Sequence, residues 1–294
     1  AGYTAGLYSA RALLEPLMFA GYMSGGQLML TSDIENFPGY PKGIGGPEMM
    51  MELREQAERF GLEVHDKNVE RVDLSRRPYS VWVEGEEYKS ESLIICTGAE
   101  SIWLGVEGEE AQKGRGISTC ATCDGAFFKD EEVIVVGGGD SAMEEATFLT
   151  RFAKKVTIVH RRDVFRASKV MYERAVNHEK IEIKTFKNVS SWLSDENGLT
   201  GAVLEDSRDG SKENIDCTGA FIAIGHKPIT KFLEGQLETD SSGYILHKEN
   251  TMTSKEGVFA AGDVVDTRYR QAITAAGMGC QAAIDAEKWL ESQH

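Results

Sequence analysis

Short apolar runs alternate with helical patterns along this chain, and several of the runs end at glycine. These runs cover residues 93–98, 133–139, 220–225 and 257–262. Buried strands that alternate with helices are typical of α/β domains with parallel sheets. The pattern therefore predicts an α/β fold whose strands end at glycine-rich turns.

The second apolar run begins a self-contained βαβ unit. The next strand follows at residues 156–159. Between the two strands, apolar residues recur at three- and four-residue spacing, so one face of a helix can pack on the sheet. These residues are Ala142, Ala146, Leu149 and Ala153. We expect a nucleotide-binding domain over residues 103–226, inserted into a discontinuous domain made of residues 1–102 and 227–294.

The first residues look like part of a second nucleotide-binding turn. Residues 1–12 match the third glycine and the helix of a G-x-G-x-x-G turn, without its strand and its first two glycines. Either the chain is truncated at this end or the domain forms without its usual start. We expect the first strand of the discontinuous domain to be missing.

Composition narrows the class of protein. The chain has 294 residues, of which 41% are hydrophobic, so it can form two domains with buried cores. Its net charge of -15 argues against nucleic-acid binding, because Lys and Arg must neutralise phosphates there. No apolar run reaches the roughly 18 residues of a membrane span, and the N-terminus does not resemble a signal peptide. We expect a cytoplasmic protein without membrane association.

One pair among the five cysteines is closely spaced: Cys120 and Cys123 form a CxxC motif, which Asp124 follows. A CxxC in a reducing compartment is more often catalytic or metal-binding than structural. The zinc alternative needs about four ligands, and the sequence has no second CxxC or close His pair, so we expect no metal. Asp124 could act as a general acid or base, or cap a helix. The remaining cysteines are interpreted as small buried hydrophobic residues: Cys96, Cys217 and Cys280.

A glycine-rich turn follows the second apolar run and fits a dinucleotide. Gly137, Gly139 and Ala142 occupy the three positions of G-x-G-x-x-G/A, which allow a pyrophosphate to approach a helix N-terminus. About twenty residues later, where NAD-binding proteins carry an acid, this sequence has basic residues. Their positive charge suits the 2'-phosphate of NADP, although they could also form a solvated basic surface. The cluster comprises His160, Arg161, Arg162 and Arg166.

The last glycine junction could serve a flavin. Asp263 follows a strand and a glycine, and residues 268–271 lead into a helical pattern that continues through Leu290. The positive end of that helix dipole would stabilise the negative charge of a reduced flavin. The alternative is a helix N-terminus that binds nothing.

Together these motifs resemble the low-molecular-weight thioredoxin reductases, which are flavoproteins that carry a CxxC in their NADPH domain. The resemblance implies two Rossmann-like domains, with the NADPH domain inserted into the FAD domain. It also implies a homodimer whose partner is thioredoxin. The motifs that carry it span nearly the whole chain: residues 25–28, 35–39, 97–99, 120–125, 137–146, 160–167, 223–226 and 257–276.

The resemblance also implies a role for individual residues. Electrons would pass from NADPH through FAD to the disulfide, with Cys123 on the flavin side, Cys120 attacking thioredoxin and Asp124 donating a proton. The inserted domain would have to rotate during turnover. The residues implied for FAD are Gly2, Ala5, Gln27, Asn36, Val69, Thr97, Gly98, Asp263, Arg270, Gln271 and Ala272. The residues implied for NADPH are Gly138, Gly139, Asp140, Ser141, His160, Arg161, Arg162, Arg166 and Ile224.

Several alternatives remain open at the level of sequence. The residues flanking the dithiol could contact thioredoxin, although the two phenylalanines among them could equally be core: Lys113, Arg115, Phe127 and Phe128. Because little sequence follows Trp289, we expect thioredoxin to be a separate protein. The electron acceptor could instead be a peroxiredoxin or a glutaredoxin-like protein. The chain could also be an inactive nucleotide-binding fragment.

Overall fold

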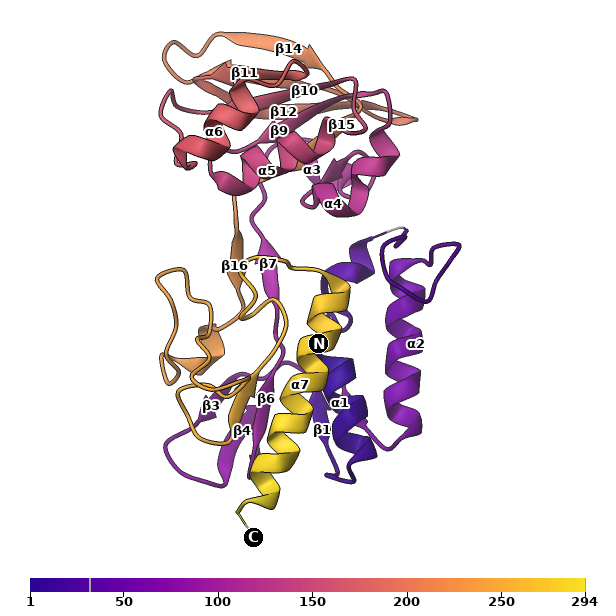
Figure 1. Ribbon diagram of the computed structural model, residues 1–294, viewed down its shortest axis with the longest axis vertical. Coiled ribbons are helices and arrows are strands. Elements are labelled where there is room, and N and C mark those ends of the chain that lie inside the picture. The colour runs from indigo at the N-terminus through magenta and orange to yellow at the C-terminus, as the bar shows by residue number, and fades with distance from the viewer. Residues whose placement is uncertain (32, 294) are drawn as a thin grey trace. The chain divides into compact units, whose positions relative to one another are not determined.

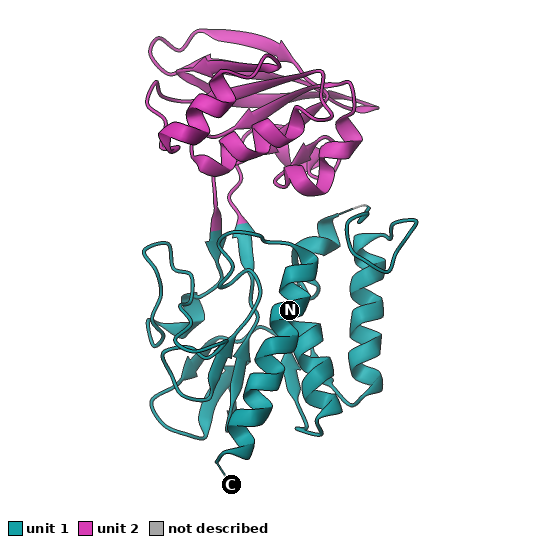
Figure 2. Ribbon diagram, viewed as in Figure 1, with its two compact units in different colours: residues 1–100, 227–294 teal, residues 101–226 magenta. Residues whose placement is uncertain are grey.

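The computed structural model describes residues 1–31 and 33–293 and divides into two compact units (Figure 1 and Figure 2). Unit 1 comprises residues 1–100 and 227–294, and unit 2 comprises residues 101–226. Where the chain passes between the units, β7 (Ala99–Ser101) pairs with β16 (His226–Pro228). The sequence placed the first boundary two residues later, at 102/103. The assignment of one cofactor to each unit remains a prediction.

A parallel sheet of five strands forms the centre of unit 2. Each neighbouring pair in this sheet runs parallel, as the βαβ pattern predicts. The strand order is β11 (Ile181–Thr185), β10 (Lys155–His160), β9 (Glu132–Val136), β15 (Gly219–Ile222) and β8 (Ile117–Ser118). The helices of this unit are α3 (Glu109–Gln112), α4 (Ala121–Asp124), α5 (Asp140–Leu149) and α6 (Lys169–Val176), with the 3-10 helix η2 (Gly125–Phe128).

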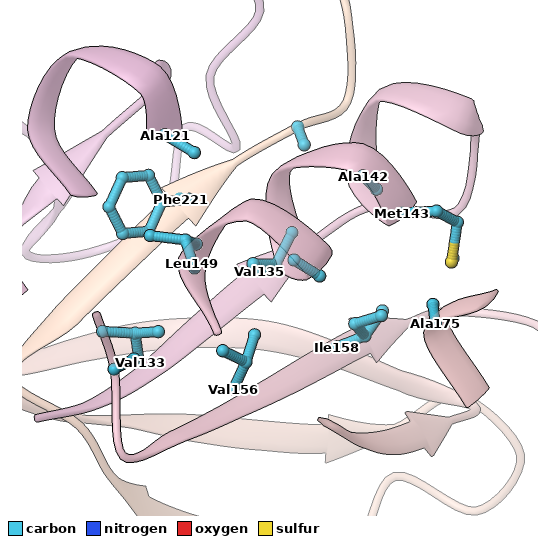
Figure 3. Packing of buried hydrophobic residues seen from close by; sticks show 13 residues of the cluster. Ala121, Val133, Val135, Ala142, Met143, Leu149, Val156, Ile158, Ala175 and Phe221 are labelled. Carbon is cyan, nitrogen blue, oxygen red and sulfur yellow. The ribbon is translucent and has the colours of Figure 1, made fainter. Parts of the chain in front are cut away.

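Both faces of this parallel sheet are buried, which explains why the sequence of β9 is apolar without interruption. Side chains alternate along a strand, so Val133 and Val135 pack beneath α5 and α6 (Figure 3). Ile134 packs on the other face, against a three-stranded antiparallel sheet that includes Leu204. That sheet consists of β12 (Lys187–Asp195), β13 (Gly198–Asp206) and β14 (Lys212–Asp216). The predicted inner face of α5 and its C-terminal extension is confirmed as fully buried: Ala142, Ala146, Leu149 and Ala153.

Unit 1 contains three smaller sheets and begins with helix α1 (Gly2–Arg11) rather than with a strand. Two parallel pairs join β1 (Leu17–Phe19) to β2 (Glu63–His65) and β6 (Leu93–Ile95) to β17 (Val258–Ala260). The antiparallel sheet consists of β3 (Arg71–Asp73), β4 (Tyr79–Val83) and β5 (Glu86–Ser90). The helices are α1, α2 (Gly46–Arg59) and α7 (Ala272–Glu291), with the 3-10 helices η1 (Gly26–Leu30) and η3 (Lys231–Leu233).

Helices α1 and α7 lie against each other at close range (Figure 1). A Cβ atom on Gly279 of α7 would lie only 2.2 Å from the carbonyl oxygen of Ala1, so this approach requires glycine. On the other side of the unit, Val81 of β4 shares a core with Ile95 of β6 and Val258 of β17. This core fixes the strands whose ends carry Thr97 and Asp263. Across residues 1–31 and 33–293, no helix is both long and apolar enough to cross a membrane.

Candidate redox and nucleotide sites

Cys120 and Cys123 are joined by a disulfide in unit 2, with their sulfur atoms 2.08 Å apart and their Cα atoms 5.3 Å apart. Cys120 immediately precedes α4, and its carbonyl accepts hydrogen bonds from the N–H groups of Cys123 and Asp124 at 3.2 and 3.1 Å. The N–H of Cys120 donates to Ser118 Oγ at 3.0 Å. These backbone bonds hold both sulfur atoms in a single turn.

Asp124 ends the same turn. Burial raises the pKa of its carboxyl group, and a hydrogen bond with Ser118 opposes that shift only in part. A carboxyl group with a raised pKa keeps its proton to higher pH, so it can exchange a proton with a nearby sulfur. Cys120 is the N-cap of α4, and Asp124 occupies the N-cap position of η2 but makes no side-chain capping bond there. Ser118, which the sequence reading missed, touches both Cys120 and Asp124.

Two of the other cysteines, Cys96 and Cys217, lack the environment of a reactive thiol. Burial raises the pKa of Cys96 to about 11 and that of Cys217 to about 12, so both stay protonated near neutral pH. Cys217 is buried as predicted, whereas Cys96 and Cys280 are only partly buried. Within the described residues, no group of three or more His, Cys, Asp or Glu side chains could hold a metal ion.

The three positions of the glycine-rich turn in unit 2 have distinct environments. A Cβ atom on Gly137 would lie 2.4 Å from the carbonyl oxygen of Ala223 and 2.8 Å from the Cβ of Ala142, so this position needs glycine for packing. A Cβ atom on Gly139 would meet no atom within 4 Å. Gly139 is the N-cap of α5, so the space around it lies at a helix N-terminus. This combination fits a pyrophosphate, which needs an open approach to backbone N–H groups.

The basic loop after β10 folds back onto the same turn. The carbonyl oxygen of Gly138 accepts hydrogen bonds from the N–H groups of Arg166 and Ala167 at 2.7 and 3.1 Å. A Cβ atom on Gly138 would lie 2.3 Å from the ring of His160. This glycine therefore lets the loop and the turn approach each other, which brings the predicted nucleotide residues together.

The positive charge of this loop affects the pKa of His160. Burial lowers the pKa of His160, and the charges of Arg161, Arg162 and Arg166 lower it further. Its ring is therefore neutral at pH 7 and lies 4.5 Å from the ring of Phe165. Among residues 1–31 and 33–293, none of the three guanidinium groups forms a salt bridge with a carboxylate. Their charge is available to an anion such as a phosphate.

The other residues predicted to bind the nucleotide lie at the start of α5 and after β15. Asp140 starts α5, and its Oδ1 accepts a hydrogen bond from the N–H of Ser168 at 2.6 Å, which ties the helix to the basic loop. Ser141 is exposed in the first turn of α5. Ile224 follows β15 and is partly buried against the core beneath the antiparallel sheet.

All residues predicted to bind FAD lie in unit 1. Asn36 and Gln271, far apart in the sequence, meet where Asn36 Nδ2 donates to Gln271 Oε1 at 3.3 Å. Gln27 donates a hydrogen bond to the carbonyl of Ala99, and Thr97 Oγ1 donates to the carbonyl of Ile229 at 2.7 Å. The others lie at the start of α1, before β3, after β6, and at the start of α7: Gly2, Ala5, Val69, Gly98, Arg270 and Ala272.

Asp263 carries the clearest mark of a ligand site in unit 1. Its Oδ1 atom is buried and has no hydrogen-bond partner among the described residues. Burial raises the pKa of this carboxyl group to about 6, with a smaller contribution from Asp266. A buried acceptor without a partner destabilises the protein unless a ligand or water supplies a donor. A hydroxyl of the FAD sugar-alcohol chain is such a donor, so this residue fits FAD.

Asp266 shapes the segment between Asp263 and α7, although the sequence reading did not identify it. Burial alone would raise the pKa of Asp266, but hydrogen bonds from the N–H groups of Tyr269, Arg268 and Arg270 lower it. These three bonds measure 2.8 to 2.9 Å. Gln271 and Thr274 then form a capping box at the start of α7. The signal in the sequence is an Asp shortly before a helix, which is common in turns and easily overlooked.

The chain matches the pyridine nucleotide-disulphide oxidoreductase family over residues 1–279. It belongs to this family. The thioredoxin reductase of Mycolicibacterium smegmatis is 52% identical, covering 100% of this chain and 94% of the relative. The thioredoxin reductase of Vibrio cholerae is 48% identical, with the same shares covered. The solved structure of a thioredoxin reductase from Giardia duodenalis has a TM-score of 0.94 at 42% identity, covering 98% of this chain and 95% of that one.

These comparisons confirm the family recognised from the sequence motifs, that of the thioredoxin reductases. They also confirm the predicted α/β class with two Rossmann-like domains. The protein is accordingly an oxidoreductase, and the alternative of an inactive nucleotide-binding fragment is not supported.

Proposed function

We propose that this protein reduces the disulfide of thioredoxin with electrons from NADPH, through bound FAD and the Cys120–Cys123 pair. The observation that carries the proposal is a closed CxxC disulfide next to a carboxyl group of raised pKa. The same unit contains an open glycine turn and an unpaired basic loop that suit NADPH. Thioredoxin reductase is also the activity named for relatives about half identical over the whole chain.

FAD, when bound, supplies the two-electron relay between the nicotinamide and the disulfide. In unit 1, Asp263 would accept a hydrogen bond from a hydroxyl of this cofactor, because its buried Oδ1 lacks a partner among the described residues. The N-terminus of α7, which begins after Gln271, would face negative charge on the flavin. The proposed FAD site further includes Gly2, Ala5, Gln27, Asn36, Val69, Thr97, Gly98, Arg270 and Ala272.

In unit 2, the residues around the glycine turn would bind NADPH. The open space at Gly139 would receive the pyrophosphate, while Arg161 and Arg162 would bind the 2'-phosphate. The neutral His160 would lie beside this phosphate without repelling the arginines. The proposed NADPH site further includes Gly138, Asp140, Ser141, Arg166 and Ile224.

Reduction of the protein disulfide consumes two electrons and two protons and yields the thiols of Cys120 and Cys123. The Cys120 thiol then loses its proton to solvent, and its thiolate attacks one sulfur of the thioredoxin disulfide, which forms a mixed disulfide. The other thioredoxin sulfur leaves as a thiolate and takes a proton from Asp124. Finally the Cys123 thiolate attacks Cys120 Sγ, which releases the second thioredoxin thiol and restores the Cys120–Cys123 disulfide.

The surface beside the dithiol would contact thioredoxin. Phe127 has a half-exposed side chain, whereas Phe128 packs edge-on against Phe221 with ring centroids 5.4 Å apart. The two phenylalanines therefore differ, one available to a partner and one mainly in the core. Phe128 and Arg115 also line a pocket of about 380 Å³, which could receive a side chain of the partner. Lys113 lies 4.4 Å above the ring of Trp103, but its ammonium group pairs with Glu110 at 2.6 Å, so it would add little net charge to this surface.

We further propose that the protein works as a homodimer in the cytoplasm. Several apolar side chains of unit 1 are largely exposed and would be available to a second copy of the chain. Three cysteines remain free, which suits a reducing compartment. The exposed apolar residues include Tyr22, Met23, Leu30 and Met51.

Substitution of each redox cysteine tests the proposal. Cys120→Ser and Cys123→Ser should each abolish NADPH-dependent reduction of thioredoxin, while NADPH still bleaches the flavin, because hydride transfer precedes thiol chemistry. Cys217→Ala is the matched control, since this thiol lies in the same unit but is buried and protonated. Continued thioredoxin reduction by either serine variant would refute the proposal. A higher kcat/KM for a peroxiredoxin or a glutaredoxin-like protein would refute only the choice of acceptor.

A further inference from the structure

The basic loop of unit 2 is held from a second side, away from the glycine turn. The hairpin turn between β13 and β14 covers residues 207–211. In this turn, Ser207 Oγ donates a hydrogen bond to the carbonyl oxygen of Arg161 at 3.1 Å. The backbone of Arg161 is therefore fixed by a residue that follows it by 46 positions in the sequence.

The topology of unit 2 brings these segments together. His160, the last residue of β10, pairs in register with Thr185 of β11. The chain then turns at Phe186, which has a φ of 58°, and enters β12. Lys187 of β12 pairs with Asp206, the last residue of β13. The turn that follows Asp206 consequently lies beside the residue that follows His160.

The hairpin turn is itself rigidly held. The carboxylate of Asp206 is only 4% exposed and accepts hydrogen bonds from the backbone N–H, Nε and a terminal nitrogen of Arg208 at 2.8 to 3.0 Å. Lys187 Nζ lies 3.2 Å from the same carboxylate. The N–H of Ser207 donates to the carbonyl of Phe186 at 2.7 Å, and the Arg208 guanidinium lies 4.4 Å from the ring of Phe186.

The acidic residue next to Ser207 pairs with other partners than the basic loop. Asp206 is the acidic residue closest in sequence to Ser207, and its carboxylate is committed to Arg208 and Lys187. Ser207, which contacts Arg161, is a neutral hydroxyl. The turn can therefore restrain Arg161 without neutralising its guanidinium group.

We propose that Ser207 is a positioning residue for recognition of the NADPH 2'-phosphate, which acts by fixing the backbone from which the Arg161 side chain extends. This inference rests on the proposed function of the basic loop. Without the hydroxyl, the Arg161 peptide gains conformational freedom that phosphate binding must then remove. Ser207 does not have to touch the nucleotide for this effect.

Binding of two small probes to the FAD-loaded protein tests the inference by calorimetry. Adenosine 2',5'-bisphosphate contains the 2'-phosphate, and adenosine 5'-monophosphate lacks it. Ser207→Ala should raise the Kd of the bisphosphate about fivefold, which corresponds to one ordinary hydrogen bond, and leave the Kd of the monophosphate unchanged. Ser207→Thr, which retains a hydroxyl, should restore tight binding. In turnover, the alanine variant should show a raised KM for NADPH with an unchanged kcat.

Ser211→Ala is the matched control, because this serine lies in the same turn and its hydroxyl bonds Asp209 rather than Arg161. Equal bisphosphate affinity in Ser207→Ala and the wild type, or an equal loss for both probes, would overturn the inference. If the alanine variant does not fold, Ser207→Val replaces it in the comparison with threonine. A wild type that binds both probes equally would instead refute the assignment of the basic loop to NADPH.

Discussion

Gly139 allows the nucleotide site to be perturbed without perturbing the fold. A Cβ atom at this position would meet no atom within 4 Å, and the φ of −102° is open to any residue. Gly139→Ala should therefore change the free energy of unfolding by less than about 1 kcal/mol. Gly137→Ala is the contrasting variant, because its methyl group would lie 2.4 Å from the carbonyl oxygen of Ala223. Such overpacking typically costs about 1 to 3 kcal/mol.

The effect of Gly139→Ala on NADPH should be large. A pyrophosphate hydrogen-bonded to the first N–H groups of α5 would occupy the space that the new methyl group fills. We expect the KM for NADPH to rise at least tenfold, which corresponds to about 1.4 kcal/mol of lost binding. Urea unfolding and NADPH kinetics on the same preparation separate the two effects. Normal NADPH affinity in a folded Gly139→Ala protein would refute the placement of the pyrophosphate.

Three further variants test the charged residues of the two proposed sites. Replacing both Arg161 and Arg162 by Ala should raise the KM for NADPH roughly tenfold or more and leave that for NADH nearly unchanged; equal effects would mean that neither arginine binds the 2'-phosphate. Asp124→Asn should lower the rate of thioredoxin reduction about 100-fold. Because burial raises the pKa of Asp124, the wild-type rate should also fall as pH rises through that pKa, a limb that the variant's pH profile should lack. The pKa of Asp263 is raised to about 6, so this carboxyl group binds a proton more tightly in the folded protein than in the unfolded chain. The free energy of unfolding of the FAD-free protein should therefore fall as pH rises from about 4 to about 6. Asp263→Asn should remove about 3 kcal/mol of this dependence in urea unfolding, and an equal change of unfolding free energy with pH in the variant and the wild type would contradict that assignment.

Sequence periodicity was sufficient to predict the parallel sheet of unit 2. The apolar run of β9 and the three- and four-residue spacing of α5 each reflect burial on a defined face, and these faces are buried in the structure. The glycine positions were also informative, because Gly137 and Gly139 have the close and open environments that the motif requires. Such patterns involve residues that are close together in the sequence, so they can be recognised in a single sequence.

Long-range contacts could not be predicted in this way. The bond between Ser207 and Arg161 depends on how a hairpin meets the end of β10, and nothing near either residue indicates it. Ser118 and Asp266 act through hydrogen bonds to neighbouring backbone N–H groups, and such residues are frequent in any turn. The different environments of Phe127 and Phe128 likewise follow from tertiary packing, since the two residues are adjacent in the sequence.

An anaerobic NADPH titration of the FAD-saturated protein tests the central claim most directly. A flavin and the Cys120–Cys123 disulfide each accept two electrons, so the flavin absorbance should bleach fully only after about two equivalents of NADPH. The Cys120→Ser variant has no disulfide to reduce and should need about one equivalent. Equal requirements in the two proteins, or a flavin that NADPH does not bleach, would contradict electron transfer from NADPH through the flavin to this disulfide.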